Sequence, residues 1–236
     1  MTADSELEEL KTFYDEVYYA NAKKTPQNYG HLKALANKMG VTGEHRVLDI
    51  ACGLGEWLKV CNENGAKVHG IDLSTKAIEF CQKTIPDGEF YAQPAESLPF
   101  ADEHFDYVTC LGSLEHFVDP VGALKEMVRV ARPDANFVLL VPNKDFLTRK
   151  LKLYAGTNQK DAKEVVRTLD EWREMFEISG LEVQERWKDL HVLSWSWISM
   201  GGWLHMPLRA VQALALSVWP LKWQYQVYHL CTVKGN

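Results

Sequence analysis

The stretch VLDIACGLGEWL, residues 47–58, joins a run of apolar residues to a turn that contains Gly53 and Gly55. A glycine-rich turn between a buried strand and a helix is typical of sites that bind nucleotides, most often through their phosphates. Asp49, however, stands just before the turn, where its carboxylate would repel a phosphate. Leu58 also occupies the position of the third glycine in the dinucleotide-binding pattern. The stretch therefore favours a cationic ligand without phosphate.

Strand and helix patterns alternate on both sides of this turn. Apolar runs typical of strands occupy residues 46–51, 67–72, 89–93, 105–111, 136–142, 181–187 and 225–233. The earlier runs barely alternate between apolar and polar residues, as expected of strands buried on both faces of a parallel sheet. The order predicts an α/β fold with a doubly wound, mostly parallel seven-stranded sheet of the Rossmann-like type, with the ligand at the carboxyl ends of the strands. The last strand is expected to be antiparallel and to lie at an edge.

Capping signals predict where helices begin. An amphipathic helix is expected over residues 5–20, and later helices are expected to start at Thr25–Pro26, Ser74, Asp119–Pro120 and the capping box from Thr168 to Glu171. We expect one domain over residues 1–236. It would comprise an N-terminal helical cap at 1–40, a cofactor-binding core at 41–142 and an acceptor-side half at 143–236.

Composition excludes several classes of protein. The net charge is −6 over 236 residues with no long basic run, which argues against a nucleic-acid partner. Five scattered cysteines without a C-x-x-C pair predict reduced thiols, with no disulfide frame and no metal site. The acidic, polar start MTADSELEEL does not resemble a targeting peptide. The expected compartment is therefore the cytoplasm.

A second acid, Asp72, ends the next strand. An acidic residue at this spacing commonly binds ribose hydroxyls, a role that would fit NAD as well. Asp49 separates the two ligands, because S-adenosylmethionine carries an ammonium and a sulfonium group and no phosphate. The pair of acids therefore favours S-adenosylmethionine.

These residues together carry a family resemblance. The segments D49-I-A-C-G53-L-G55, G-I-D72-L-S, Q93-P-A-E96-S-L-P-F and F105-D-Y-V-T-C-L-G-S-L-E-H-F follow one another in order. The chain resembles the class I S-adenosylmethionine-dependent methyltransferases over about residues 30–142. It is most similar to the small-molecule branch that includes the ubiquinone and menaquinone biosynthesis enzymes.

The resemblance implies a set of cofactor-binding residues. Asp49, Ala51, Gly53 and Gly55 would line the methionine end of the cofactor. Asp72 would bind the ribose, with Leu73, Ala95 and Glu96 around the adenine and with Leu111 and Gly112 below the sulfonium. For Glu96, the alternative of a solvated loop charge stays open.

Two histidines are candidates for a catalytic base. His116 follows the strand at 105–111, and His191 follows the strand at 181–187, where Asp189 could orient it. His116 has a competing interpretation as a structural or cofactor-contacting residue. His31 is expected to contact the cofactor or to cap a helix, and for Tyr14, Tyr18 and Tyr19 a place over the pocket and a packing role both stay open.

A tryptophan-rich insertion, at about residues 190–223, precedes the last strand. Leu204, Leu208, Val211, Ala215 and Val218 recur at helical spacing and form an apolar stripe, while Gly201, Gly202 and Pro207 interrupt any membrane-spanning run. Three interpretations stay open: a lid over the acceptor pocket, a homodimer or membrane-surface face, and plain core.

The sequence thus predicts methyl transfer from S-adenosylmethionine to a small apolar or amphipathic acceptor, with oxygen as the expected receiving atom. The alternatives are N- or C-methylation of a small molecule, a non-catalytic S-adenosylmethionine-binding protein and, less favoured, an NAD-dependent oxidoreductase.

Overall fold

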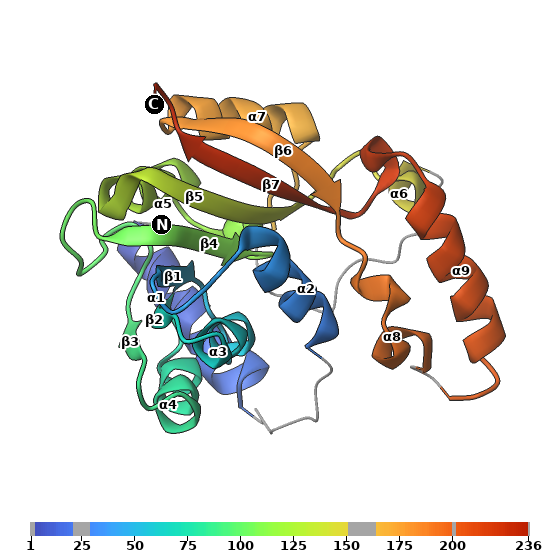
Figure 1. Ribbon diagram of the computed structural model, residues 1–236, viewed down its shortest axis with the longest axis horizontal. Coiled ribbons are helices and arrows are strands. Elements are labelled where there is room, and N and C mark those ends of the chain that lie inside the picture. The colour runs from blue at the N-terminus through green and yellow to red at the C-terminus, as the bar shows by residue number, and fades with distance from the viewer. Residues whose placement is uncertain (1–2, 21–28, 151–163, 200–201, 236) are drawn as a thin grey trace.

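The computed structural model describes residues 3–20, 29–150, 164–199 and 202–235 (Figure 1). Seven strands form one sheet in the order β3-β2-β1-β4-β5-β7-β6. The strands are β1 Arg46–Ile50, β2 Lys67–Asp72, β3 Glu89–Ala92, β4 Phe105–Leu111, β5 Ala131–Pro142, β6 Leu181–Lys188 and β7 Gln226–Val233. Strands β1 to β5 pair in parallel, and β7 runs antiparallel to both of its neighbours. The predicted doubly wound, Rossmann-like sheet is confirmed.

The position predicted for the last strand was wrong. Strand β7 lies between β5 and β6 and is hydrogen-bonded on both sides, so β6 forms the edge. Val227, Tyr228 and His229 are consecutive buried residues, as a strand with neighbours on both sides requires. Strand β7 therefore contributes side chains to the cavity described below.

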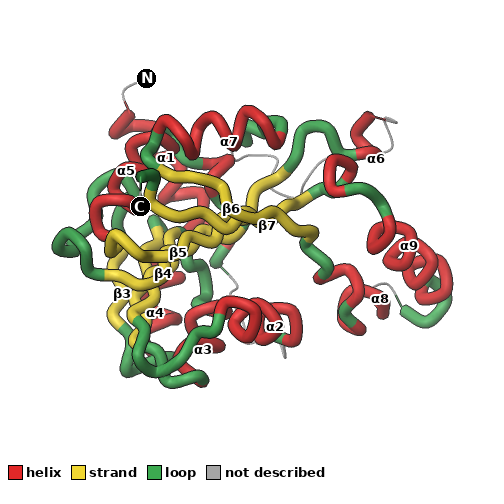
Figure 2. The backbone as a smooth tube through the Cα atoms, turned by 45° about the horizontal axis from the view of Figure 1, so that its top comes forward, coloured by secondary structure: helices red, strands yellow, loops and turns green. Residues whose placement is uncertain are grey.

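Helices cover both faces of the sheet (Figure 2). They are α1 Ala3–Phe13, α2 Gly30–Met39, α3 Glu56–Glu63, α4 Thr75–Thr84, α5 Pro120–Val130, α6 Leu147–Lys150, α7 Leu169–Ile178, α8 Trp195–Ser199 and α9 Met206–Val218, and the π-helical turn η1 Tyr14–Tyr18 continues α1. Helices α5 and α7 bury their apolar sides on one face, together with Leu48 and Ile50 of β1. Helices α2, α3 and α4 do so on the other face, together with Val47. Each face thus has its own core.

Most of the predicted helix starts are confirmed. The Ser74 hydroxyl accepts from the Ala77 N–H, and the Asp119 carboxylate accepts from the Gly122 N–H. Thr168 and Glu171 form the reciprocal capping box of α7. The start predicted at Thr25–Pro26 lies outside the described residues, and α2 begins at Gly30.

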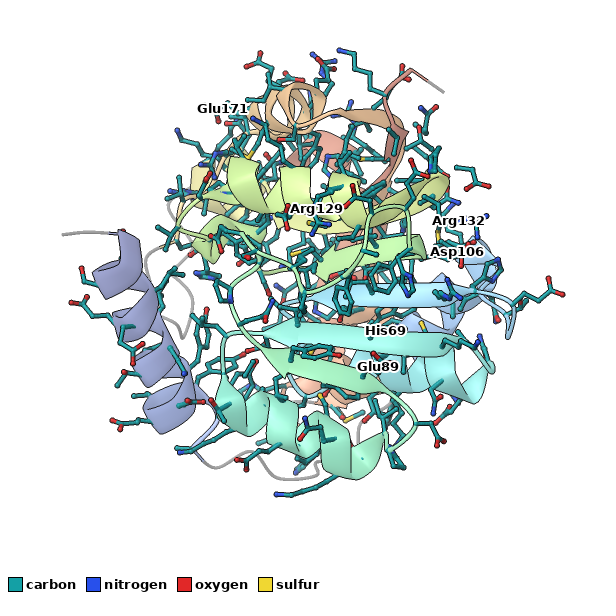
Figure 3. The ribbon with its side chains drawn as sticks, turned by 90° about the vertical axis from the view of Figure 1, so that its left-hand side faces the viewer. His69, Glu89, Asp106, Arg129, Arg132 and Glu171 are labelled. Atoms are coloured by element: carbon teal, nitrogen blue, oxygen red, sulfur yellow. The ribbon has the colours of Figure 1, made fainter. Side chains whose placement is uncertain are left out.

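A single guanidinium fixes the loop between β3 and β4. Arg129, in the last turn of α5, donates to the carbonyls of Leu98 and Phe100 at 3.1 and 2.9 Å (Figure 3). It also pairs with Asp102 and Glu126. The loop carries Ala95 and Glu96, so Arg129 positions residues that the sequence assigned to the ligand site.

We therefore expect Arg129→Met to lower the free energy of unfolding by about 1–2 kcal/mol, because two partly buried carbonyls lose their donor. The matched control is Arg173→Met on α7, whose ion pairs with Asp170 and Glu177 are solvent-exposed. It should change stability by less than about 0.5 kcal/mol. Urea unfolding of the three proteins measures both values, and equal effects of the two substitutions would refute the role of Arg129.

Candidate functional site

The turn after β1 holds three residues in the left-handed region. Ala51, Gly53 and Gly55 have φ of 57°, 53° and 72°. A Cβ on Gly53 would lie 3.0 Å from the Tyr19 hydroxyl, and a Cβ on Gly55 would lie 2.9 Å from the Cys81 sulfur. Gly53 therefore leaves room for the Tyr19 hydroxyl beside the turn, while Gly55 allows α3 and α4 to pack. Left-handed backbone at an alanine is costly and is typical of functional sites.

A cavity of about 590 Å³ lies at the carboxyl ends of the central strands. Its lining includes the predicted residues Asp49, Ala51, Gly53, Asp72, Leu73, Ala95, Glu96, Leu111, Gly112, His116 and His191. Gly55 is the one predicted site residue outside this lining, and its place is in the packing described above. The cavity adjoins the neighbouring ends of β1 and β4, where the strand order of this doubly wound sheet reverses.

The lining of this cavity is acidic. Its lining contains the carboxylates Asp49, Glu56, Asp72, Glu96 and Asp189 and, within the described part of the chain, no lysine or arginine. A phosphate would find no cationic partner here. A ligand with positive charge and with hydroxyl or amine donors would be stabilised.

Asp49 is buried at the end of β1. Its Oδ1 accepts a hydrogen bond of 2.6 Å from the Thr109 hydroxyl on β4. Burial raises the pKa of this carboxyl to about 7; the hydrogen bond from Thr109 opposes the shift, and the nearby Asp72 adds to it. Asp49 is thus held close to its ionisation point near neutral pH.

Asp72 joins two loops at the end of β2. Its Oδ2 accepts from the Gly53 N–H at 2.9 Å, and its Oδ1 accepts from the Ser74 N–H at 2.8 Å. Burial raises its pKa to about 6, although these N–H groups favour the ionised form. Each oxygen keeps a second lone pair for a ligand hydroxyl.

The N-terminal helix closes one side of the cavity. Tyr14, Tyr18 and Tyr19 line it, and burial raises the pKa of Tyr14 and Tyr19 well above the usual range. Asp15 fixes this wall, because its Oδ1 accepts from the Ser74 hydroxyl at 2.5 Å and from the Lys76 N–H at 3.2 Å. The tyrosines thus form part of the site as well as packing against one another.

The two candidate bases line the same cavity from different strands. His116 ends the short helix Leu114–His116 after β4. His191 follows β6, and its Nδ1 lies 2.5 Å from Oδ2 of Asp189, a contact that the sequence spacing left open. That hydrogen bond raises the pKa of His191, while partial burial opposes the shift. The His31 ring lies 6.4 Å from the His191 ring, and burial lowers its pKa.

Glu96 has a defined partner at the rim. Its Oε1 accepts a hydrogen bond of 3.2 Å from the Asp119 N–H, at the start of α5. The contact places Glu96 against the body of the protein while it still lines the cavity.

Sequence reasoning missed several lining residues. Trp57, Gln226 and Tyr228 are among them. The two residues on β7 reach the cavity because β7 pairs with β5, with Gln226 opposite Pro142 and Tyr228 opposite Leu140. A prediction that placed the last strand inside the sheet would have indicated that Gln226 and Tyr228 line the cavity. Trp57 is buried in the first turn of α3, where its apolar character suggested only core.

Comparisons with known proteins agree with this geometry. Residues 48–139 match a family described as a methyltransferase domain. An uncharacterised methyltransferase of Bacillus subtilis is 30% identical over 173 residues, which cover 67% of this chain and 66% of that protein. A ubiquinone biosynthesis O-methyltransferase of Pseudoalteromonas translucida is 34% identical over 131 residues, covering 52% of this chain and 53% of that protein.

A solved structure resembles the whole chain. In the complex between the Haloferax volcanii Trm112 methyltransferase activator and a methyltransferase described as putative, the matching chain has a TM-score of 0.66 and 16% identity. The match covers 100% of this chain and 99% of that chain, and at this identity it shows the fold alone. The chain spans between about half and two thirds of the length of the curated relatives quoted above.

The raised pKa of Asp49 gives a pH-dependent stability. Well below its ordinary pKa of 3.8 the carboxyl is protonated in both folded and unfolded chains, so its ionisation does not affect stability. As the pH rises from about 4 toward 7, the unfolded chain ionises first, and the folded chain loses stability. Asp49→Asn keeps the acceptor for Thr109 and cannot ionise. Relative to the wild type, the ligand-free variant should therefore gain about 1–3 kcal/mol of unfolding free energy between pH 5 and pH 8. Urea unfolding across this range measures the gain, and a pH-independent difference would contradict it.

Proposed function

Because the chain belongs to the class I S-adenosylmethionine-dependent methyltransferases, we propose that it transfers a methyl group from S-adenosylmethionine to the oxygen of a small apolar or amphipathic acceptor. The observation that carries the proposal is the acidic cavity. Five carboxylates without a lysine or arginine among the described lining residues suit a sulfonium and an ammonium group. A dinucleotide would bring a pyrophosphate into the same negative field.

Residues at the ends of β1, β2 and β4 and in the loop after β3 can each be assigned to one part of S-adenosylmethionine. In this proposal Asp49 and the turn from Ala51 to Gly53 receive the ammonium end. Asp72 uses its free lone pairs for the ribose hydroxyls. Leu73, Ala95 and Glu96 surround the adenine, and Leu111 and Gly112 lie beneath the sulfonium.

The bound cofactor supplies an electrophilic methyl group, and the protein has to align the acceptor and exclude water. The N-terminal helix would exclude water, because the wall of tyrosines fixed by Asp15 lies above Asp72. For a hydroxyl acceptor we assign the base to His191. Asp189 holds its Nδ1–H, so Nε2 is free to accept a proton, and the same carboxylate stabilises the imidazolium that results.

His116 is the second candidate for this base. It lines the cavity from the β4 side, next to the proposed sulfonium position. Because the contact with Asp189 orients the His191 imidazole, we keep the base at His191 and assign His116 to contact with the cofactor or the acceptor. N- or C-methylation would need a different acceptor but the same cofactor site.

The acceptor is proposed to be apolar because apolar side chains also line the cavity. Leu7 and Leu10 come from α1, Phe117 and Val118 follow the short helix Leu114–His116, and Tyr228 comes from β7. We also propose the division expected from the sequence, with a helical cap at 1–40, a cofactor-binding core at 41–142 and an acceptor-side half at 143–236. A cytoplasmic site of action is proposed from the five cysteines, all of which are free and buried.

Cofactor identity is tested by calorimetry with S-adenosylhomocysteine and NAD. We expect micromolar binding of S-adenosylhomocysteine and no binding of NAD. Asp72→Ala should weaken S-adenosylhomocysteine by about 10²-fold, since both ribose hydroxyl contacts and the support of the Gly53 turn are lost. The control Asp134→Ala removes an exposed acid that pairs with the surface residue Arg132, and it should bind normally. Tight NAD binding, or no binding of either nucleoside, would contradict the assignment of S-adenosylmethionine as the cofactor.

The base is tested with methyl-labelled S-adenosylmethionine against a panel of apolar phenols and alcohols. His191→Gln should lower kcat by about 10²-fold without changing cofactor affinity. The wild-type rate should rise with pH as His191 loses its proton. Because Asp189 raises the pKa of His191, this rise should occur at a higher pH than for an ordinary histidine. Asp189→Asn should move that inflection to lower pH, because the partner that raises the pKa of His191 is removed. An unchanged kcat in His191→Gln together with a loss in His116→Gln would reverse the assignment, and turnover confined to amine acceptors would replace oxygen by nitrogen.

A further inference from the structure

The helical insertion between β6 and β7 carries an apolar surface that the fold leaves exposed. We define the α9 face as the side chains of Leu204, Leu208, Val211, Leu214 and Val218, each at least 64% exposed. Leu208, Val211, Leu214 and Val218 recur at spacings of three and four residues, so they share one side of α9, and Leu204 lies in the turn just before the helix. Trp195 and Trp203 are exposed on the same insertion. Of the stripe predicted from the sequence, Leu204, Leu208, Val211 and Val218 are exposed, whereas Ala215 is partly buried and Leu214 is exposed in its place. None of these residues is among the described lining residues of the cavity.

The orientation of α9 is fixed by polar contacts on its other side. Gln224 donates to the carbonyls of Leu216 and Trp219, and Lys188 donates to the carbonyl of Ser217. Ala213 is the buried residue of the helix. Surface helices normally turn their apolar side to the core, and α9 turns a small residue inward and large apolar residues outward. The exposed face thus calls for an apolar environment outside this chain.

Charge indicates what that environment is. Residues 190–223 contain no aspartate or glutamate, although the chain has 32 acidic residues. The charged residues within the insertion are Arg209 and Lys222, and each lies over a tryptophan ring. Arg209 is on α9 and Trp197 on α8, while Lys222 and Trp223 follow α9 in the short helix Leu221–Trp223. Tryptophan rings and cations beside an apolar helix face are typical of segments that lie in the interface of an anionic bilayer.

We propose that the α9 face docks on the surface of an anionic lipid bilayer, with the helix lying in the membrane plane. The helix has 13 residues, fewer than the roughly 20 that a span needs. Over the described parts of the chain, no helix is long and apolar enough to cross a membrane. A symmetric contact with a second copy is disfavoured, because it would bring two sets of Arg209 and Lys222 together with no acidic partner from the insertion.

Docking in this manner also bears on the substrate. Helices α8 and α9 lie at one end of the molecule, away from α3 and α4 (Figure 1). His191, at the start of the insertion, lines the cavity. A docked molecule would therefore hold its acceptor side near the lipid, and the acceptor would be an apolar molecule dissolved in the bilayer. This last step rests on the proposed function, whereas the docking itself does not.

Vesicle sedimentation of the full chain tests the proposal. The protein should sediment with vesicles of phosphatidylcholine and phosphatidylglycerol, and much less with phosphatidylcholine alone. The combined variant Leu208→Gln, Val211→Gln and Val218→Gln should lose at least about tenfold in partitioning, because three apolar contacts with lipid are removed. The control Ile178→Gln changes an equally exposed apolar residue on α7 and should bind as the wild type does.

Independent readouts separate the outcomes. S-adenosylhomocysteine binding should be equal in the wild type and the combined variant, so that failure of docking and failure of the cofactor site are distinguishable. Should the combined variant not fold, quenching of wild-type tryptophan fluorescence by brominated phosphatidylglycerol replaces it, with strong quenching expected. Absence of vesicle binding or of quenching, equal binding by the combined variant, or a wild-type dimer that the variant converts to monomers would overturn the proposal.

Discussion

Two carboxyl groups buried at the ends of adjacent strands are the constraint on which this site depends. Asp49 and Asp72 are almost fully buried, and burial raises the pKa of both. Ionising them without a partner costs free energy, which the hydrogen bonds from Thr109, Gly53 and Ser74 only partly offset. A cationic ligand with hydroxyl donors offsets that cost, so the folded protein should be more stable with such a ligand in the cavity than without it.

The rest of the molecule positions these two groups. Asp72 ties the glycine turn to the start of α4, and Asp15 ties the N-terminal helix to the same point through Ser74. Arg129 fixes the loop that brings Ala95 and Glu96 to the rim. In the proposed function the acceptor side is formed by the ends of β6 and β7, which follow the proposed cofactor-binding half in the chain. The two halves of the site therefore come from different parts of the sequence.

Local patterns were sufficient for the cofactor half. The apolar runs, the glycine turn and the caps at Ser74, Asp119 and Thr168 predicted the sheet and helices that the structure has, because each depends on neighbours in the chain. The acceptor half depends on long-range pairing. The place of β7 between β5 and β6, and hence the contribution of Gln226 and Tyr228, requires contacts that no local pattern encodes. Likewise, helical spacing predicted the stripe on α9 but could not tell whether it faces inward or outward.

The central claim is that a cationic cofactor ionises Asp49 when it binds. Calorimetric titration with S-adenosylmethionine at pH 6.5, in two buffers of different ionisation enthalpy, measures the protons released per molecule bound. Because the pKa of Asp49 is about 7 in the free protein, binding of the cation should lower it and release a proton to the buffer. The release should fall sharply in Asp49→Asn. Equal heats in the two buffers, or proton uptake by the wild type, would contradict the account.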